Sequence, residues 1–318
     1  MPSETALDRA APAPLYRDPV FDGAADPTLV WNPWEAEWWM VYTQRRAKLD
    51  LPGVAWCHGT EIGVARSTDA GRSWEYLGTL PLAAPDPEYS FWAPDIVRDE
   101  AGVYHLFVSY VPGMHEDWSG DRYIFRYTST DLRTWEGPAR LSLASDRCID
   151  PSLFRVPNGP WRLWYKDEGH GSQTFAVESD DLVTWRAASD PAVSRLYGEA
   201  PKIFRFGDWY WLLKDPNSGL DVYRSDDLLG WEYQGKILEL PGERNDDANV
   251  GKHPDVIVSG DRAFIFYFTH PHRDVPLKDR MQHYAVRRTS IQVAELQIED
   301  GELTCDREAP CMVRLTPP

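Results

Sequence analysis

Short apolar and aromatic runs alternate with polar turn segments along most of the chain, and no long window has the 3.6-residue period of an amphipathic helix. The runs have the length and the Val, Ile, Tyr and Trp content typical of β-strands. A phrase that begins with Ser and Asp and ends in Trp follows four of these runs, at residues 67–74, 129–135, 179–185 and 225–231. The pattern therefore predicts an all-β protein with little helix.

The repeated phrase has the physical chemistry of a hairpin turn. Asp and Ser side chains hydrogen-bond the backbone of a tight turn, and a Trp on the outgoing strand can bury a large apolar surface between neighbouring sheets. Successive copies lie about 45 to 60 residues apart, a period typical of propellers and solenoids. Four unrelated Asp-rich turns would not be expected to share the same order of strand, turn and Trp.

The strand-like runs fall into five units of four, and the fifth unit lacks the Trp phrase. Four antiparallel strands per unit, arranged radially, predict a five-bladed β-propeller that protects its sheet edges by closure. We expect a flexible leader at residues 1–15 and a single catalytic domain at 16–318. The predicted blades span approximately residues 20–80, 89–140, 148–190, 197–236 and 250–310.

Two insertions interrupt the even spacing of the strands. They are residues 43–60 in the first unit and 270–290 in the fifth, each between the second and third strands of its blade. Loops of this length in a compact domain are often functional.

Composition narrows the class of protein. The 318 residues include 15 Trp and carry a formal net charge of −17, which argues against a nucleic-acid partner because phosphates need Lys and Arg clusters. No apolar run is long enough to span a bilayer, and no secretory signal is visible at the N-terminus. The four Cys are scattered without a CxxC pair, as in a reducing compartment. We therefore expect a cytoplasmic protein without a membrane partner.

Each predicted first strand begins with a carboxylate or a His beside a proline. First strands are innermost in a propeller, so their starts meet at one end of the central channel, and proline is tolerated at the first residue of a strand. Carboxylates gathered in one pocket repel one another, which costs stability unless function requires them. The starts predicted to form one acidic funnel are Asp26-Pro27, Pro94-Asp95, Asp150-Pro151, Glu199-Ala200-Pro201 and His253-Pro254-Asp255.

These starts resemble the blade-start motifs of glycoside hydrolase family 43 and its five-bladed relatives, in blade order over about residues 20–300. The resemblance implies a hydrolase that removes terminal sugars, typically α-L-arabinofuranose or β-D-xylose, with inversion, so the expected partner is an oligosaccharide. Two motifs depart from the family, because Ala200 stands where Gly is usual and Lys252 separates Gly251 from His253. The similar motifs are Ala25-Asp26-Pro27, Phe91-Trp92-Ala93-Pro94-Asp95, Ile149-Asp150-Pro151-Ser152 and Gly198-Glu199-Ala200-Pro201.

The resemblance also implies catalytic roles. Asp26 would be the general base that activates water, Glu199 the general acid, and Asp150 the group that orients the acid and tunes its pKa. Glycoside hydrolysis needs one protonated and one ionised carboxyl group at the scissile bond, and an inverting enzyme keeps them roughly 6.5–9.5 Å apart so that water fits between them. A third carboxylate would raise the pKa of the acid, because like charges disfavour a second ionisation.

Further residues would form the sugar subsite. The resemblance places Trp92 and Asp95 there, and His253 resembles a fifth-blade His that lies by a hydrated calcium ion in the channel of many members; no cofactor is expected to be required. Loops between second and third strands should form the walls of the pocket on the same face, and they carry Arg45, His58, Trp118 and Lys166.

The pair Arg45-Arg46 is open to two interpretations. It is either a solvated basic turn or a reader of a carboxylate or sulfate on the sugar.

Two other classes of function compete with this interpretation. One is another propeller glycosidase, of the fructosidase, sialidase or anhydrogalactosidase type. Residues 67–74 match the sialidase Asp-box, which is a structural hairpin, but neither a sialidase Arg triad nor the Asn-Asp-Pro-Asn start of fructosidases is found at the blade starts. The other class is a propeller that binds carbohydrate without cleaving it, and the joint presence of Asp26, Asp150 and Glu199 argues against that class.

Overall fold

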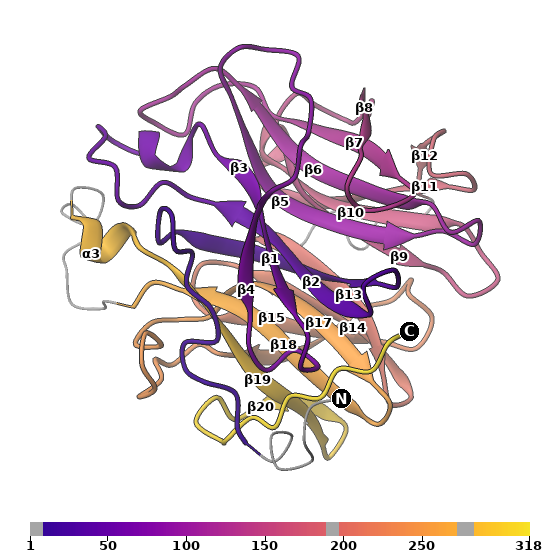
Figure 1. The fold of residues 1–318 in the computed structure, drawn as a ribbon. Helices are drawn as coiled ribbons and strands as arrows, with labels where there is room; N and C mark the ends of the chain where they lie inside the picture. Colours follow the sequence, from indigo (N-terminus) through magenta and orange to yellow (C-terminus); the bar gives the residue numbers. More distant parts are fainter. Residues whose placement is uncertain (1–8, 189–196, 272–282) are drawn as a thin grey trace.

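Five four-stranded antiparallel sheets lie around a common axis, which confirms the predicted five-bladed β-propeller (Figure 1). The computed structural model describes residues 9–188, 197–271 and 283–318. Sheet order follows chain order within every blade. The first strand of each blade contacts the first strands of the neighbouring blades, so these five strands form the innermost ring around the channel.

Each blade consists of four consecutive strands. Blades one and two contain β1 (Ala24–Asn32), β2 (Glu37–Gln44), β3 (Glu61–Ser67), β4 (Glu75–Thr79), β5 (Tyr89–Arg98), β6 (Tyr104–Pro112), β7 (Tyr123–Ser129) and β8 (Glu136–Arg140). Blades three and four contain β9 (Cys148–Arg155), β10 (Trp161–Asp167), β11 (Gln173–Ser179), β12 (Arg186–Ala187), β13 (Glu199–Phe206), β14 (Trp209–Asp215), β15 (Leu220–Ser225) and β16 (Glu232–Ile237). Blade five contains β17 (Lys252–Ser259), β18 (Arg262–Thr269), β19 (Ser290–Glu299) and β20 (Glu302–Cys305).

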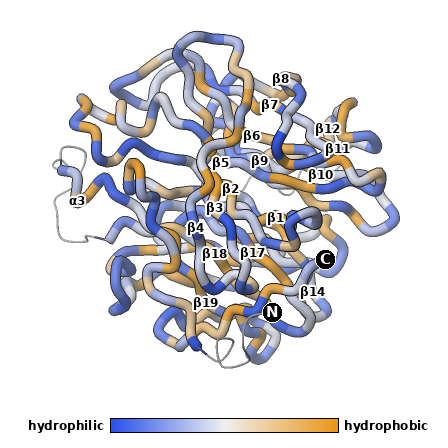
Figure 2. The backbone as a smooth tube through the Cα atoms, in the orientation of Figure 1, coloured by the Kyte–Doolittle hydropathy of each residue, from blue (hydrophilic) through white to orange (hydrophobic). Residues whose placement is uncertain are grey.

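Burial decreases from the inner to the outer strands of a blade. All eight residues of β2 are buried, whereas β4 has no buried residue and all of β8 is exposed. Inner strands are covered on both faces by neighbouring blades, which explains their near-continuous apolar and aromatic sequences. Figure 2 shows such a hydrophobic stretch along β18, while many connecting loops are hydrophilic.

The four repeated phrases form the predicted hairpins between the third and fourth strands. In the first copy, Asp69 Oδ1 accepts hydrogen bonds from the Ser67 hydroxyl and from the backbone N–H groups of Arg72 and Ser73. The indole of Trp74 donates to the Gly71 carbonyl at 3.0 Å and so closes the turn. The same Ser–Asp contact recurs in the other three copies. Local side-chain chemistry therefore sets each hairpin.

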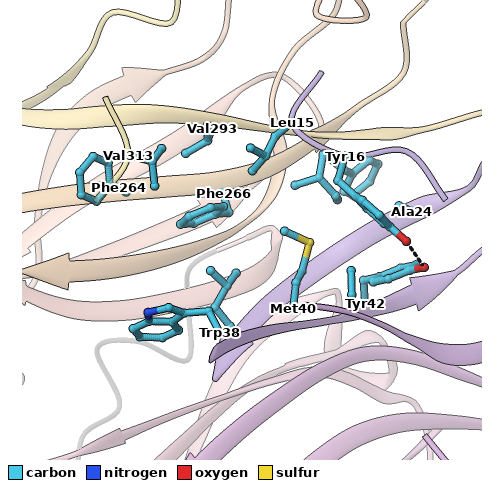
Figure 3. Packing of buried hydrophobic residues seen from close by; sticks show 14 of the residues in the cluster. Leu15, Tyr16, Ala24, Trp38, Met40, Tyr42, Phe264, Phe266, Val293 and Val313 are labelled. Atoms are coloured by element: carbon cyan, nitrogen blue, oxygen red, sulfur yellow. Dashed lines mark hydrogen bonds between the residues drawn. The ribbon is translucent and has the colours of Figure 1, made fainter. Parts of the chain in front are cut away.

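The chain ends close the ring between blades one and five. Backbone N–H groups of Leu15 and Tyr16 donate to the Ile291 carbonyl of β19, and the Leu315 N–H donates to the Ala70 carbonyl of the first hairpin. Figure 3 shows the buried cluster at this seam, where the Tyr16 hydroxyl lies 2.9 Å from that of Tyr42. At the described end of the predicted leader, Leu15 is buried in this cluster and Ala11 packs against it. Residues 1–8 lie outside the described residues.

Both insertions lie where the sequence predicts them. Residues 45–60 connect β2 to β3 and contain the 3₁₀ turn η1 (Ala55–Cys57), and η2 (Glu168–His170) follows β10. Residues 272–282 of the fifth-blade insertion lie outside the described residues, and the rest of it includes α3 (Tyr284–Arg287). None of the helices in the described part of the chain is long and apolar enough to cross a membrane.

Candidate active site

One backbone irregularity recurs in the first strand of every blade. A β-bulge lies where a residue precedes a proline, and that residue adopts a left-handed conformation. Positive φ is uncommon for residues other than Gly, and bulges re-aim side chains next to active sites. The five residues are Asp26 (φ 52°), Ala93 (47°), Asp150 (57°), Ala200 (51°) and His253 (39°).

These bulges open onto a pocket of about 400 Å³. Eight of the ten predicted site residues line it: Asp26, Arg45, Trp92, Trp118, Asp150, Lys166, Glu199 and His253. The other lining residues, which the sequence pattern did not single out, are Cys57, Arg122, Ile149, Glu168 and Asn217. Asp95 and His58 do not line the pocket.

Asp26 is held as a carboxylate. Burial raises its pKa, but Arg45 and His253 outweigh burial and hold the pKa below its ordinary value. Arg45 Nη2 lies 3.0 Å from Asp26 Oδ1, and His253 Nδ1 lies 3.4 Å from the same oxygen. An ionised carboxylate is the form that accepts a proton from water.

Asp150 differs from Asp26, although both occupy the same position of the bulge. Burial raises the pKa of Asp150 to about 6, and the charge of Glu199 adds to this effect. Its Oδ2 accepts the backbone N–H of Ala200 at 3.1 Å, which links it to the residue after Glu199. Two carboxyl groups of the same pocket therefore favour different protonation states.

Glu199 precedes its bulge residue, so its side chain approaches the pocket from a different backbone position. Burial raises its pKa, but Lys166 and Lys252 outweigh burial and lower the pKa below its ordinary value. Lys166 Nζ lies 2.9 Å from Glu199 Oε2. The upward shift that we expected from the neighbouring Asp150 is therefore outweighed by a lysine.

Trp92 and Trp118 form an aromatic wall of the pocket. Trp92 is buried and its indole donates to the Cys57 carbonyl at 2.7 Å, whereas Trp118 is 49% exposed. The two rings meet edge to face with centroids 6.1 Å apart. His58 lies behind this wall, with its ring centroid 5.1 Å from that of Trp92, and burial lowers the pKa of His58 to about 4. We therefore assign His58 to the support of Trp92 rather than to contact with a ligand.

The two arginines of the pair have different surroundings. The Arg45 guanidinium forms an ion pair with Asp26, and its Cζ lies 4.6 Å from the centroid of the Phe268 ring, so it is part of the site. Arg46 donates to the Ala55 carbonyl at 3.1 Å and does not line the pocket. Neither residue forms a solvated basic turn, and the ionic partner of Arg45 is a protein carboxylate.

Asp95, expected in the sugar subsite, lies elsewhere in the channel. It is two residues past its bulge position, and its Oδ1 accepts from Lys202 Nζ at 3.2 Å. The same ammonium group lies 2.7 Å from Asp255 Oδ1. Asp95 Oδ2 accepts the Leu153 N–H, and Asp255 Oδ2 accepts the Leu29 N–H. This cluster, called the lysine tie below, joins all five blades around the half-buried Lys202.

The donor set of the channel does not fit the calcium ion implied by the resemblance. Among the described residues no three His, Cys, Asp or Glu side chains are grouped to hold a metal ion. His253 faces Asp26, and the carboxylates of Asp95 and Asp255 already share the Lys202 ammonium group. Calcium needs six to eight oxygen ligands, so we derive no step from a metal.

Comparisons with known proteins agree with this architecture. No family model matches the sequence, and no curated protein sequence matches it. Solved structures match over nearly the whole chain. A thermostable family-43 glycoside hydrolase has 17% identity and a TM-score of 0.66, over 95% of this chain and 99% of that chain. A family-43 enzyme of Xanthomonas citri, in complex with xylotriose, has 17% identity and a TM-score of 0.65, over 98% of each chain.

A third similar structure is a family-43 β-xylosidase/α-arabinofuranosidase from a compost metagenome, in complex with xylotriose and in a calcium-free form. It has 15% identity and a TM-score of 0.61, over 94% of this chain and 97% of that chain. At these identities the comparisons establish the architecture. The chain has the five-bladed β-propeller fold of the family-43 glycoside hydrolases.

Proposed function

We propose that this protein is a glycoside hydrolase that releases a terminal sugar, such as α-L-arabinofuranose or β-D-xylose, from an oligosaccharide with inversion. One observation carries the proposal: Asp26, Asp150 and Glu199, which lie far apart in the sequence, line a single pocket. Structures of the same fold include enzymes bound to xylotriose, which supports an oligosaccharide ligand. Trp92 and Trp118 offer apolar faces against which a sugar ring can pack.

The assigned chemistry uses two carboxyl groups of the pocket. Asp26, held ionised by Arg45 and His253, takes a proton from water while that water forms a bond to the anomeric carbon. The electron pair of the breaking glycosidic bond goes to the leaving oxygen, which takes the proton of Glu199. Asp150 orients this region through the Ala200 N–H. A pocket of about 400 Å³ favours removal of one terminal sugar over internal cleavage.

Leaving-group dependence tests the two roles separately. We expect Asp26→Asn to reduce the turnover of both nitrophenyl glycosides and xylobiose by about 10²–10⁴-fold. Glu199→Gln should reduce xylobiose turnover by a similar factor but spare nitrophenyl glycosides, because a nitrophenolate leaves without a proton. Proton NMR of the first anomer released tests inversion. If wild-type protein hydrolyses none of a panel of nitrophenyl glycosides but binds xylotriose, the non-catalytic class replaces this proposal.

A further inference from the structure

The ammonium group of Lys166 lies between two carboxylates. Its Nζ is 2.9 Å from Glu199 Oε2 and 3.2 Å from Glu168 Oε1. The Lys166 side chain is 11% exposed, so water screens these contacts only partly. Both acceptors line the same pocket. The lysine is therefore positioned to stabilise either carboxylate as an anion.

Glu168 also holds the segment that carries Trp118. Its Oε2 accepts hydrogen bonds from Arg122 and from Arg147 Nη2, the latter at 3.0 Å. Arg122 donates in addition to the Trp118 carbonyl, and Arg147 Nη1 donates to the Gly120 carbonyl at 2.9 Å. Glu168 thus faces two guanidinium groups with one oxygen and the Lys166 ammonium with the other.

We propose that Lys166 is a positioning residue that controls the protonation of Glu199, and that Glu168 opposes it by sharing the same ammonium group. The inference builds on the proposed function, because it gives Glu199 the role of the acid. An ionised Glu199 cannot protonate a leaving oxygen, and a lysine in direct contact stabilises that ionised form. Glu199 takes its proton from solvent before the glycosidic bond breaks. Because the Lys166 ammonium group also bonds Glu168, it stabilises the Glu199 carboxylate less, and proton uptake by Glu199 becomes easier.

Other charged groups surround Glu199 and keep their effects in every variant below. Arg45, Lys252 and His253 favour its ionised form, while Asp150 and Asp215 oppose it. The buried Lys214 lies on the same strand as Asp215. Lys166 differs from them in making a direct hydrogen bond to the Glu199 carboxylate. Removing its charge alone therefore isolates its contribution.

The test compares three variants by the pH dependence of kcat/KM. Lys166→Met should move the alkaline limb to higher pH by about 1–3 units, because an opposite charge at this distance lowers a carboxyl pKa by that amount. Glu168→Gln should move the limb to lower pH, because the ammonium group is then left to Glu199. Lys166→Arg, which keeps the charge, should restore the wild-type limb. In the Lys166→Met background, Glu168→Gln should add little further shift.

A second readout does not need turnover. The side-chain carboxyl ¹³C resonance of Glu199, assigned with Glu199→Gln, should titrate at higher pH in Lys166→Met and at lower pH in Glu168→Gln. Lys236→Met, on the outer strand β16, is the matched control and should leave both readouts unchanged, because Lys236 does not line the pocket. Melting temperatures of all variants identify any that fail to fold.

The two proposals fail in different ways. If wild-type protein hydrolyses no glycoside, the proposed function is wrong, while the carboxyl titration still decides whether Lys166 controls Glu199. If wild-type protein hydrolyses glycosides but the Glu199 titration and the alkaline limb do not move in Lys166→Met, the inference about Lys166 is overturned and the proposed function stands.

Discussion

Replacing Lys202 by Met tests the lysine tie that joins the five blades. Met keeps most of the volume of the lysine side chain but removes its charge. The change would leave Asp95 and Asp255 buried, at 4% and 2% exposure, without the ammonium group that lies 3.2 and 2.7 Å from them. Their remaining partners are backbone N–H groups and a Thr hydroxyl.

The expected loss is large because the two carboxylates stay behind. Breaking a buried ion pair by removing one partner typically costs about 3–5 kcal/mol. A chain of 318 residues unfolds with an entropy of about 0.7 kcal/mol/K, so this loss corresponds to a fall of about 4–8 °C in Tm. Burial already raises the pKa of Asp95. Without Lys202 we expect Asp95 to bind a proton still more readily. The loss of stability should therefore be largest at neutral pH and smaller in acid.

Thermal and urea unfolding at several pH values measure this loss. Lys236→Met removes a partly exposed lysine that donates to Ser218 and lies 3.7 Å from Asp221, and it should change the free energy of unfolding by no more than about 1 kcal/mol. Glycoside hydrolysis by folded Lys202→Met protein should remain, because Lys202 does not line the pocket. A Tm equal to that of wild type at neutral pH would show that the tie does not stabilise the ring, and would refute the reasoning.

Four further outcomes are expected. EDTA should leave Tm and hydrolysis unchanged; a loss of either that calcium restores would show that the channel binds a metal. Asp150→Asn should stabilise the fold near pH 8 by on the order of 2–3 kcal/mol and add little near pH 4, because the folded-state pKa of about 6 lies above that of the unfolded chain, so the destabilisation grows between about pH 4 and 6 and is complete above pH 6; equal Tm shifts at both pH values would contradict this. Trp118→Ala should raise KM for xylobiose about 3- to 10-fold with little change in kcat; an unchanged KM in steady-state assays would exclude Trp118 from the subsite. Asp247→Asn should cost about 3–5 kcal/mol in urea unfolding, because fully buried Asp247 pairs with Arg244 and Arg307; a loss below about 1 kcal/mol would contradict that estimate.

The fold could be predicted from sequence because its signals are local. Each hairpin phrase contains the Ser and Asp that bond its own turn, and the Trp that closes it lies three residues beyond the carbonyl it contacts in the first copy. The Ser–Asp contact recurs in all four copies and the Trp contact in the first two, so four copies of the phrase predict four similar hairpins. The closure of the ring was less visible, because it joins Leu15 to Ile291 across nearly the whole chain.

The site was predicted only in part because the bulge is not visible in the sequence. Asp-Pro and Pro-Asp both resemble a strand start, but the left-handed residue always precedes the proline. Asp26 and Asp150 therefore line the pocket, whereas Asp95 lies in the lysine tie. Glu168 and Arg122 were missed for another reason: their partnership joins loops of different blades, and no spacing within one blade predicts it.

In each inner strand the bulge separates two positions whose side chains have different surroundings and different partners. We call the residue before the proline the upper position and the residue after it the lower position. The bulge interrupts the regular alternation of the strand between them. The upper positions include Asp26 and Asp150, which adopt a left-handed backbone, and burial disfavours ionisation of Asp150. The lower positions include Lys202, whose ammonium group lies between the carboxylates of Asp95 and Asp255 on two other blades. These lower contacts tie blades together, whereas the upper residues Asp26 and Asp150 line the pocket. Substitutions in the lower set should therefore lower stability before activity, and substitutions in the upper set should do the reverse.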